Sequence, residues 1–213
     1  MKMFLPAASA GLLLVSACAT NGGPSRNVIT GAGVGAVAGA GVGAMAGGND
    51  TRNAAIGAAV GALAGAAVGD YMDKQERALR QATANSNIEV ERRGDQIQLT
   101  APSDVTFDVS SAQIKSAFYP TLNDVASTLK QFPQTSIDIV GHASTDGDAS
   151  FNQSLSERRA ASVSSYLTGQ GVNSVRIKSY GYGESQPLPG IPGNSPANRR
   201  VEMILTPVVD ETA

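Results

Sequence analysis

The stretch 141–163, GHASTDGDASFNQSLSERRAASV, decides the fold because it joins a strand to a helix through a polar loop. Residues 136–141, SIDIVG, have the composition of a buried strand. Residues 155–168 form a helical segment that Gly169 ends, and Asp146-Gly147-Asp148 between the two is typical of a polar turn. The stretch therefore predicts a strand–loop–helix unit.

The flanking sequence extends this unit into a domain. Residues 88–99 alternate apolar and polar side chains around Gly94-Asp95, which predicts a β-hairpin. Apolar residues at helical spacing over 114–132 predict a helix that stops before Pro133. Further strands are predicted at 104–109, 175–180 and 200–206. The sequence thus predicts an α+β fold, a mixed β-sheet with two main helices on one face.

Four motifs in this region are recognisable. The stretch 141–163 resembles the motif G-H-T-D-x-x-G-x-x-x-Y/F-N-x-x-L-S-x-x-R-A of the OmpA-like peptidoglycan-binding domain. The other three are similar to that family's first-strand signature, its Gly-x-Gly-Glu-x-x-Pro loop and its last-strand start: TFD at 106–108, GYGESQP at 181–187 and NRRVE at 198–202. The resemblance covers about residues 88–207 and implies the OmpA C-terminal-like fold.

The resemblance implies recognition of a ligand and no catalysis. Family members bind diaminopimelate of the peptidoglycan stem peptide, a zwitterion whose carboxylate needs a guanidinium and whose ammonium needs a carboxylate. The family's Arg maps onto Arg159 and its Asn onto Asn152, and Arg200 in the NRRVE motif completes the predicted set. No cofactor and no metal is expected.

One family residue is missing from this set. Counted back from Asn152 without a gap, the family's Asp falls on Ser144, which offers the ammonium a hydroxyl without charge. Asp146 lies two residues further on. Two outcomes are open: Asp146 takes the role of the missing carboxylate, or the domain binds weakly and serves as a spacer or a surface for protein partners.

Composition excludes several other functions. Sixteen Lys and Arg stand against 18 Asp and Glu, so binding of nucleic acid through bulk charge is not expected. A single Cys and a single His exclude disulfides within the chain and Cys/His zinc clusters. His142 lies near Ser144 and Asp146 in sequence, but the chain lacks a G-x-S-x-G elbow, so we expect no hydrolase.

The first residues predict export and lipidation. Residues 1–17, MKMFLPAASAGLLLVSA, have the pattern of a secretory signal peptide and are too short in their apolar part to span a membrane. The following VSAC sequence resembles the lipobox of bacterial lipoproteins, which implies acylation of Cys18, as by palmitate. Ala19 in place of Asp favours the outer membrane, with the domain in the periplasm. Residues 18–27 then form a lipidated tether.

Glycine at every fourth position marks residues 28–69. Such a stripe lets helices approach closely in a bilayer, so the region predicts a helical hairpin that turns at 48–51. The region resembles the glycine zippers of bacterial outer-membrane lipoproteins, and a homo-oligomer held by the zipper is one expected arrangement. The other interpretation is an unstructured Gly/Ala linker. The predicted helix-packing residues are Gly31, Gly35, Gly39, Gly43, Gly57, Gly61, Gly65 and Gly69.

The remaining boundaries follow from these assignments. The charged segment 70–86 predicts a connector helix that leaves the membrane, and a tail follows the domain at 209–213. The domain itself is predicted at 87–208. As a whole, the chain resembles OmpA-family outer-membrane lipoproteins of the YiaD type, with outer-membrane lipid and peptidoglycan as expected partners. The alternative is a self-assembling glycine-zipper protein whose periplasmic domain is a spacer.

Overall fold

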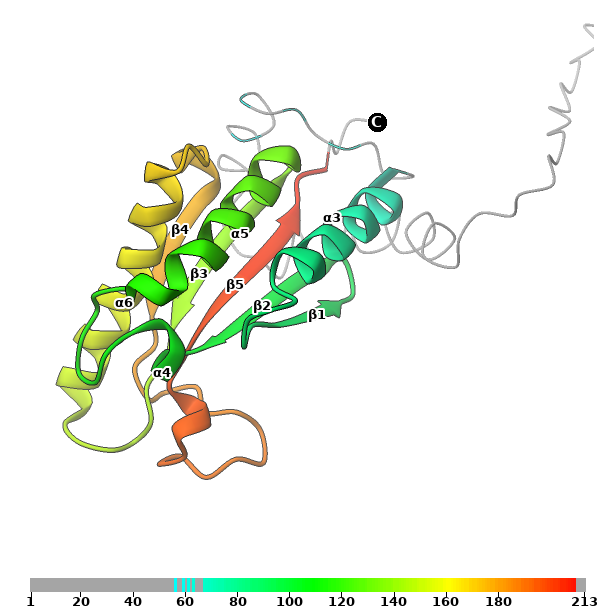
Figure 1. Ribbon diagram of the computed structural model, residues 1–213. Helices are drawn as coiled ribbons and strands as arrows, with labels where there is room; N and C mark the ends of the chain where they lie inside the picture. Colours follow the sequence, from blue (N-terminus) through cyan, green and yellow to red (C-terminus); the bar gives the residue numbers. More distant parts are fainter. Residues whose placement is uncertain (1–55, 57–58, 60, 62, 64–66, 210–213) are drawn as a thin grey trace, which may run out of the picture.

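The computed structural model describes residues 56, 59, 61, 63 and 67–209 (Figure 1). The signal peptide, Cys18, the tether and the first zipper segment lie outside these residues, and so do Gly31, Gly35, Gly39, Gly43, Gly57 and Gly65. Predictions about these residues stay predictions. Within the described part, no helix is both long and apolar enough to cross a bilayer.

A five-stranded mixed sheet forms the centre of the domain, with the strand order β1-β2-β5-β3-β4. Strands β3 and β4 pair in parallel, and the other neighbours are antiparallel. The predicted hairpin is confirmed as β1 and β2, with Gly94 in the left-handed conformation at its turn. The strands are β1 (Glu89–Arg93), β2 (Gln96–Pro102), β3 (Thr135–Gly141), β4 (Ile177–Gly181) and β5 (Arg200–Pro207).

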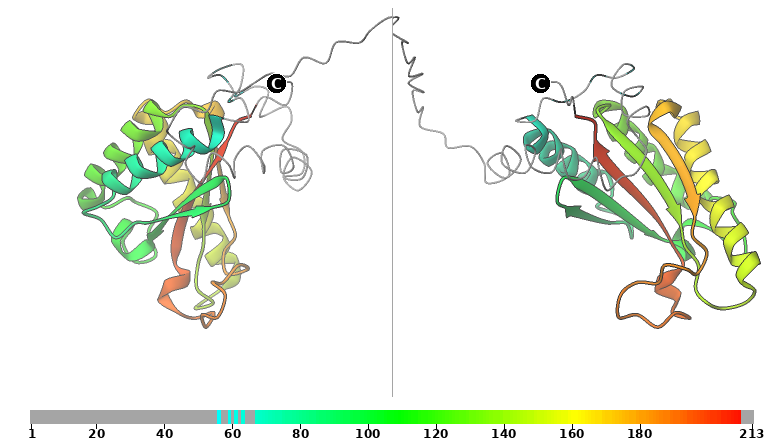
Figure 2. Two further views of the ribbon diagram at one scale, coloured as in Figure 1. Left: turned by 90° about the vertical axis from the view of Figure 1, so that its right-hand side faces the viewer. Right: turned by 180° about the vertical axis from the view of Figure 1, so that it is seen from behind.

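Three helices cover one face of this sheet: α3 (Val68–Ala82), α5 (Tyr119–Gln131) and α6 (Ala149–Gly169) (Figures 1 and 2). The α+β class and the mixed sheet are confirmed. The core lies between the sheet and the helices, where apolar side chains of both layers are fully buried, among them Leu99, Ile137, Ile139, Leu205, Leu122, Val125, Leu129 and Leu167.

Helix α3 belongs to the domain, whereas the sequence predicted a separate connector and a domain start at residue 87. Met72, Gln75 and Leu79 are buried, and the hydroxyl of Tyr71 accepts a hydrogen bond from the backbone N–H of Gln134 at 2.8 Å. The charged residues occupy the outer face of an amphipathic helix. The packed domain therefore begins before Val68.

The strand predicted at 104–109 is wrong. This segment starts as the short helix α4 (Ser103–Thr106), in which the hydroxyl of Thr106 donates to the carbonyl of Pro102. Phe107 then pairs with Ile114 in an isolated bridge and buries its ring. Of the apolar side chains in this segment, Phe107 is buried but Val109 is 96% exposed, so the segment does not form a strand of the sheet. The remaining short helices are η2 (Ser116–Phe118), η3 (Ser174–Arg176) and η4 (Pro196–Asn198).

Helix α6 begins six residues earlier than predicted. The side chain of Asp148 caps it by accepting a hydrogen bond from the N–H of Phe151 at 2.9 Å. The first turn is largely exposed, so it carries no apolar periodicity in the sequence. The predicted end at Gly169 is confirmed.

The sequence predicted a helix that continues to residue 69, but two of the described residues in this segment are not helical. Gly61 has a φ of 83°, and Leu63 forms a parallel bridge with Val209, its N–H donating to the carbonyl of Val208 at 2.8 Å. Gly69 lies inside α3 instead. The chain just before α3 is thus attached to the end of β5, and Val209 belongs to the domain.

Candidate functional site

The predicted ligand residues gather at one edge of the sheet. Strands β3 and β4 end there and β5 begins there, since Gly141 faces both Gly181 and Val201. The loops 142–148, 107–115 and 182–199 surround this edge, which we call the loop edge (Figure 1). The opposite edge, where β3 begins, β5 ends and α3 starts, we call the tether edge.

Two glycines bring helix α6 against the loop edge. A Cβ at Gly141 would lie 2.2 Å from the carbonyl oxygen of Ser156, and one at Gly181 would lie 2.4 Å from the backbone nitrogen of Glu157. Any side chain at either position would push the helix away. This close approach sets the place of Arg159, one turn further along α6.

Arg159 is a buried guanidinium without an acidic partner. Only 5% of the residue is exposed, and its guanidinium lies over the Phe107 ring, 5.2 Å from the centroid. Nε donates to the carbonyl of Ser111 at 2.8 Å and Nη2 to that of Asp108 at 3.4 Å. Among the residues that the structure describes, no acceptor bonds to Nη1 and no carboxylate pairs with the group.

The electrostatic environment of Arg159 favours an added anion. Burial, followed by the positive charges of Arg199 and Arg158, lowers the pKa of Arg159. A buried charge is usually compensated by an opposite charge. A ligand carboxylate at Nη1 would supply that compensation in the bidentate or single-contact form that guanidinium favours.

Ser144 is buried and its hydroxyl is already in use. The residue is 2% exposed; its Oγ donates to Oδ2 of Asp146 at 3.1 Å and accepts from Nη1 of Arg199 at 3.3 Å. Asp146, by contrast, has 60% of its side chain exposed, and the nearest cation is Arg199 at 3.5 Å. Asp148, the other exposed carboxylate of this loop, caps helix α6, so Asp146 is the exposed carboxylate next to Ser144.

Asn152 holds the loop in place. Its Nδ2 lies within hydrogen-bond distance of the carbonyls of Ser144 (3.1 Å) and Asp146 (3.0 Å) and of Oε2 of Glu184 (2.9 Å). The residue is buried. Asn152 thus connects the 142–148 loop to the loop that follows β4.

Arg200 lies inside the domain. It is 5% exposed; Nε donates to Glu202 at 2.7 Å, and the Nη atoms face the carbonyls of Asn198 and Gln186. Burial alone would raise the pKa of Glu202, but contacts with His142 and Arg200 outweigh it and lower that pKa to about 2. The prediction placed Arg200 among the ligand residues, whereas its contacts are structural.

His142 takes part in the same buried group and not in a triad. Its Nε2 lies 3.6 Å from Glu202, and no hydrogen-bond partner in the described residues reaches either ring nitrogen. The hydroxyl of Ser144 bonds to Asp146 and Arg199. The structure therefore does not bring Ser144 and His142 together as a nucleophile and its base.

Arg199 is the site residue that sequence reasoning missed. The NRRVE motif holds two adjacent Arg side chains, and the sequence alone does not say which one enters the sheet. The structure buries Arg200 and leaves 41% of the Arg199 side chain exposed. Strand β5 starts at Arg200, and this start decides the difference.

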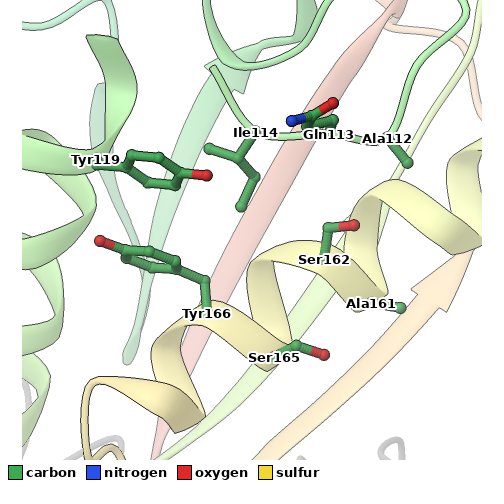
Figure 3. A pocket seen from close by; sticks show the side chains of 8 residues that line it. All are labelled: Ala112, Gln113, Ile114, Tyr119, Ala161, Ser162, Ser165 and Tyr166. Carbon is green, nitrogen blue, oxygen red and sulfur yellow. The ribbon is translucent and has the colours of Figure 1, made fainter. Parts of the chain in front are cut away.

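A pocket of about 490 Å³ lies between α6 and residues 112–119 (Figure 3). The rings of Tyr119 and Tyr166 stack at one side of it, with centroids 5.0 Å apart. The other lining residues are uncharged: Ala112, Gln113, Ile114, Ala161, Ser162 and Ser165. No group of three or more potential metal ligands occurs among the described residues.

Comparison with known families gives two matches. Residues 106–200 match the OmpA family, and residues 1–73 match the YMGG-like Gly-zipper.

Two relatives and one solved structure are similar to the chain. The probable lipoprotein YiaD of Escherichia coli is 43% identical over 143 residues, which cover 65% of this chain and 64% of that protein. The peptidoglycan-associated lipoprotein of Brucella melitensis is 36% identical over 84 residues, covering 39% and 50%. The cell wall anchor of the T6SS from Pseudomonas aeruginosa has a TM-score of 0.54 at 24% identity, covering 61% and 96%.

The similarity to the curated relatives covers only part of their length. The chain spans less than two thirds of the length of both curated relatives, and the solved structure supports the fold alone. The two family matches lie in the order that the sequence predicted. Residues 106–200 are thus similar to the OmpA family, and the preceding residues 1–73 are similar to the YMGG-like Gly-zipper.

Proposed function

We propose that this chain is a non-catalytic outer-membrane lipoprotein that tethers the membrane to peptidoglycan by binding the diamino acid of the stem peptide. Its relatives include lipoproteins, one of which is named as peptidoglycan-associated. In this proposal Cys18 is acylated and holds the chain in the outer membrane, and the domain faces the periplasm. Mass spectrometry that found Cys18 unmodified in the membrane fraction would contradict the lipid anchor.

The observation that carries the proposal is the unpaired guanidinium of Arg159. It is buried, held in orientation by two backbone carbonyls, and leaves Nη1 without an acceptor in the described residues. A structural Arg in such a place would be expected to use all its donors. A ligand carboxylate completes the set.

Asp146 is the partner that we assign to the ligand ammonium. Its exposed carboxylate lies 3.1 Å from the hydroxyl of Ser144, the position at which the family has Asp. Ser144 holds this carboxylate by a hydrogen bond, so the negative charge stays near its family position. Because Asp146 also pairs with Arg199, we expect binding that is retained but weaker than with an unpaired carboxylate.

The two edges of the domain suit a tether. The ligand residues lie at the loop edge, whereas Leu63 and α3 connect to the chain at the tether edge. A pull between membrane and cell wall would thus act along the strands of the sheet. Strand β3 connects the two edges, since it begins at Thr135 at the tether edge and ends at Gly141 at the loop edge.

Co-sedimentation with purified sacculi tests the proposal. The full chain in detergent should sediment with sacculi, and added meso-diaminopimelate should release it. Arg159→Ala should lose about ten- to a hundredfold in affinity, because a hydrogen bond to a charged group contributes roughly 1.5–3 kcal/mol. Arg158→Ala is the matched control, since Arg158 is exposed on the same helix.

Sedimentation that is unaffected by both diaminopimelate and Arg159→Ala would contradict the assignment. The second candidate function would then gain support: a self-assembling zipper protein with the domain as a spacer. The match of residues 1–73 to the YMGG-like Gly-zipper favours this candidate. Its test is deletion of residues 28–55, which spares Ile56 and Leu63 in the domain and should abolish crosslinked oligomers.

A further inference from the structure

The ion pair between Arg199 and Asp146 closes the place that the proposed function assigns to the ligand ammonium. Nη1 of Arg199 lies 3.5 Å from Oδ2 of Asp146 and 3.3 Å from Oγ of Ser144. The two charged residues come from different loops, one before α6 and one before β5. A guanidinium of this chain thus occupies the position of a ligand cation.

Asp146 is the carboxylate that lies beside Ser144 and already pairs with Arg199. The hydroxyl of Ser144 is buried, already accepts from Arg199 and carries no charge, so it is a poor second subsite for an ammonium. With Ser144, Arg199 and the ligand must compete for Asp146.

The exposure and the few polar contacts of Arg199 allow its side chain to move away from Asp146. Its side chain is 41% exposed, and among the described residues its only ion pair is with Asp146 and its only side-chain hydrogen bond is with Ser144. Solvent-exposed ion pairs are weak and are screened by salt. Arg176 shows the contrast, because backbone carbonyls bind all its nitrogens and only 1% of it is exposed.

We infer that Arg199 is a displaceable internal counterion that sets ligand specificity at this site. This inference rests on the proposed function. In the free chain Arg199 neutralises Asp146, and a ligand ammonium binds only by displacing it. The positive charge of Arg199 also acts on Arg159. The two neighbouring positive charges favour ligand carboxylates over ligand ammonium groups. The site therefore discriminates less between zwitterionic and purely anionic ligands than Asp146 alone would allow.

Two ligands separate these effects. Meso-diaminopimelate carries both ammonium and carboxylate groups, whereas pimelate has the same carbon chain and carboxylates but no ammonium. Calorimetric titration of the full chain in detergent at low salt, with each ligand, measures the preference. Arg199→Gln should tighten diaminopimelate binding about two- to fivefold, the range of an exposed ion pair, without tightening pimelate binding.

Three further variants control the result. Asp146→Asn should weaken diaminopimelate binding, and Arg199→Gln should give no gain in that background. Arg158→Gln also removes a positive charge that acts on Arg159 but forms no ion pair with Asp146, so it should not tighten diaminopimelate binding. Arg159→Ala should weaken both ligands.

The outcomes distinguish the inference from the proposed function. If wild type binds and Arg159→Ala does not, the proposed function stands, and an Arg199→Gln variant that fails to gain diaminopimelate affinity overturns the counterion role. A loss of affinity for both ligands would instead make Arg199 a receptor of ligand carboxylate. If neither wild type nor Arg199→Gln binds diaminopimelate, both proposals fall. Binding by Arg199→Gln alone would support the displacement strongly.

Discussion

Arg176 and Arg159 are buried guanidiniums at the two edges of one domain, and they differ in how their donors are used. Arg176, at the tether edge, donates to the carbonyls of Thr135, Leu129 and Phe132 at 2.7–2.9 Å and to the hydroxyl of Thr135 at 3.0 Å. Arg159, at the loop edge, donates to two carbonyls, one of them at 3.4 Å. Arg176 thus has an acceptor for each nitrogen, whereas Nη1 of Arg159 has none among the described residues.

The cost of burial is common to both. Desolvation is the first cause that lowers the pKa of each, and for Arg176 the pKa falls to about 10. Carbonyls at the end of α5 compensate this cost for Arg176, where the helix dipole also favours a cation. Arg159 has less compensation, from two carbonyls and the Phe107 ring, so under the proposed function a ligand carboxylate would gain more there.

The largest effect is expected from Arg176→Ala at the tether edge. The substitution leaves buried carbonyls of Leu129, Phe132 and Thr135 without this donor, and each lost partner costs roughly 1–3 kcal/mol. The free energy of unfolding should fall by about 3 kcal/mol or more in urea titration. Arg159→Ala should destabilise less, and equal losses in the two variants would remove the contrast between the edges.

Glu202→Gln tests the charged group beneath the loop edge. The pKa of Glu202 is about 2 in the folded chain against an ordinary 4.5, so ionised Glu202 stabilises the fold above pH 4.5. This stability, on the order of 2 kcal/mol after allowance for solvent screening, should be lost as the pH falls from 4.5 toward 2.

Thermal melts over this range measure the loss. Wild type should show a falling melting temperature between pH 4.5 and 2, and Glu202→Gln should show a flatter profile. Glu89→Gln, an exposed carboxylate of β1, is the control. Identical slopes for wild type and Glu202→Gln would mean that Glu202 does not carry this pH dependence.

Asp146→Ala and Ser144→Asp test whether Asp146 binds the ligand ammonium. Because Asp146 holds the exposed carboxylate, Asp146→Ala should weaken diaminopimelate binding about tenfold. Ser144→Asp alone should gain little, since the new carboxylate would lie beside Asp146. In the Asp146→Ala background the same change should restore binding.

Titration of the two single variants and the double variant gives the check. A silent Asp146→Ala together with a gain for Ser144→Asp would show that Asp146 does not hold the ammonium. No change in any of the three would remove the ligand from this loop.

Gly61→Ala should have the smallest effect, at the tether edge. Gly61 has a φ of 83°, and a Cβ would lie 3.3 Å from Nε2 of Gln134. Alanine is strained in this conformation, so the free energy of unfolding should fall by about 1 kcal/mol. Gly147→Ala is a matched control with a similar φ of 92° but open space around its Cβ. A loss in Gly147→Ala alone would argue against the attachment at Leu63.

The sequence predicted the elements whose side chains follow a clear period. The hairpin of β1 and β2, the end of α5 before Pro133 and the buried strand β3 were all readable, since alternation or helical spacing marks each. Arg159 was named from a motif. Helix α3 was misassigned because its charges dominate its composition, although Met72 and Leu79 face the core.

Contacts between distant loops could not be predicted. Residues 104–109 alternate like a strand, yet tertiary packing of Phe107 under Arg159 makes a turn there. Nothing in the sequence shows that the hydroxyl of Ser144 accepts a hydrogen bond from Arg199, because Arg199 lies 55 residues away. The sequence-based prediction placed Arg200 at the site, but the structure buries Arg200 and exposes Arg199, because β5 starts at Arg200.

The role of Arg159 is tested most directly with two ligands, one that carries carboxylates and one that does not. Cadaverine is the diamine that remains when both carboxylates are removed from diaminopimelate. In calorimetric titration of the full chain, wild type should bind diaminopimelate at least about tenfold tighter than cadaverine, as expected for a guanidinium–carboxylate contact. Arg159→Ala should reduce diaminopimelate to the affinity of cadaverine, while Arg158→Ala keeps the preference. An Arg159→Ala chain that still prefers diaminopimelate by the wild-type factor would show that this guanidinium does not receive the ligand carboxylate.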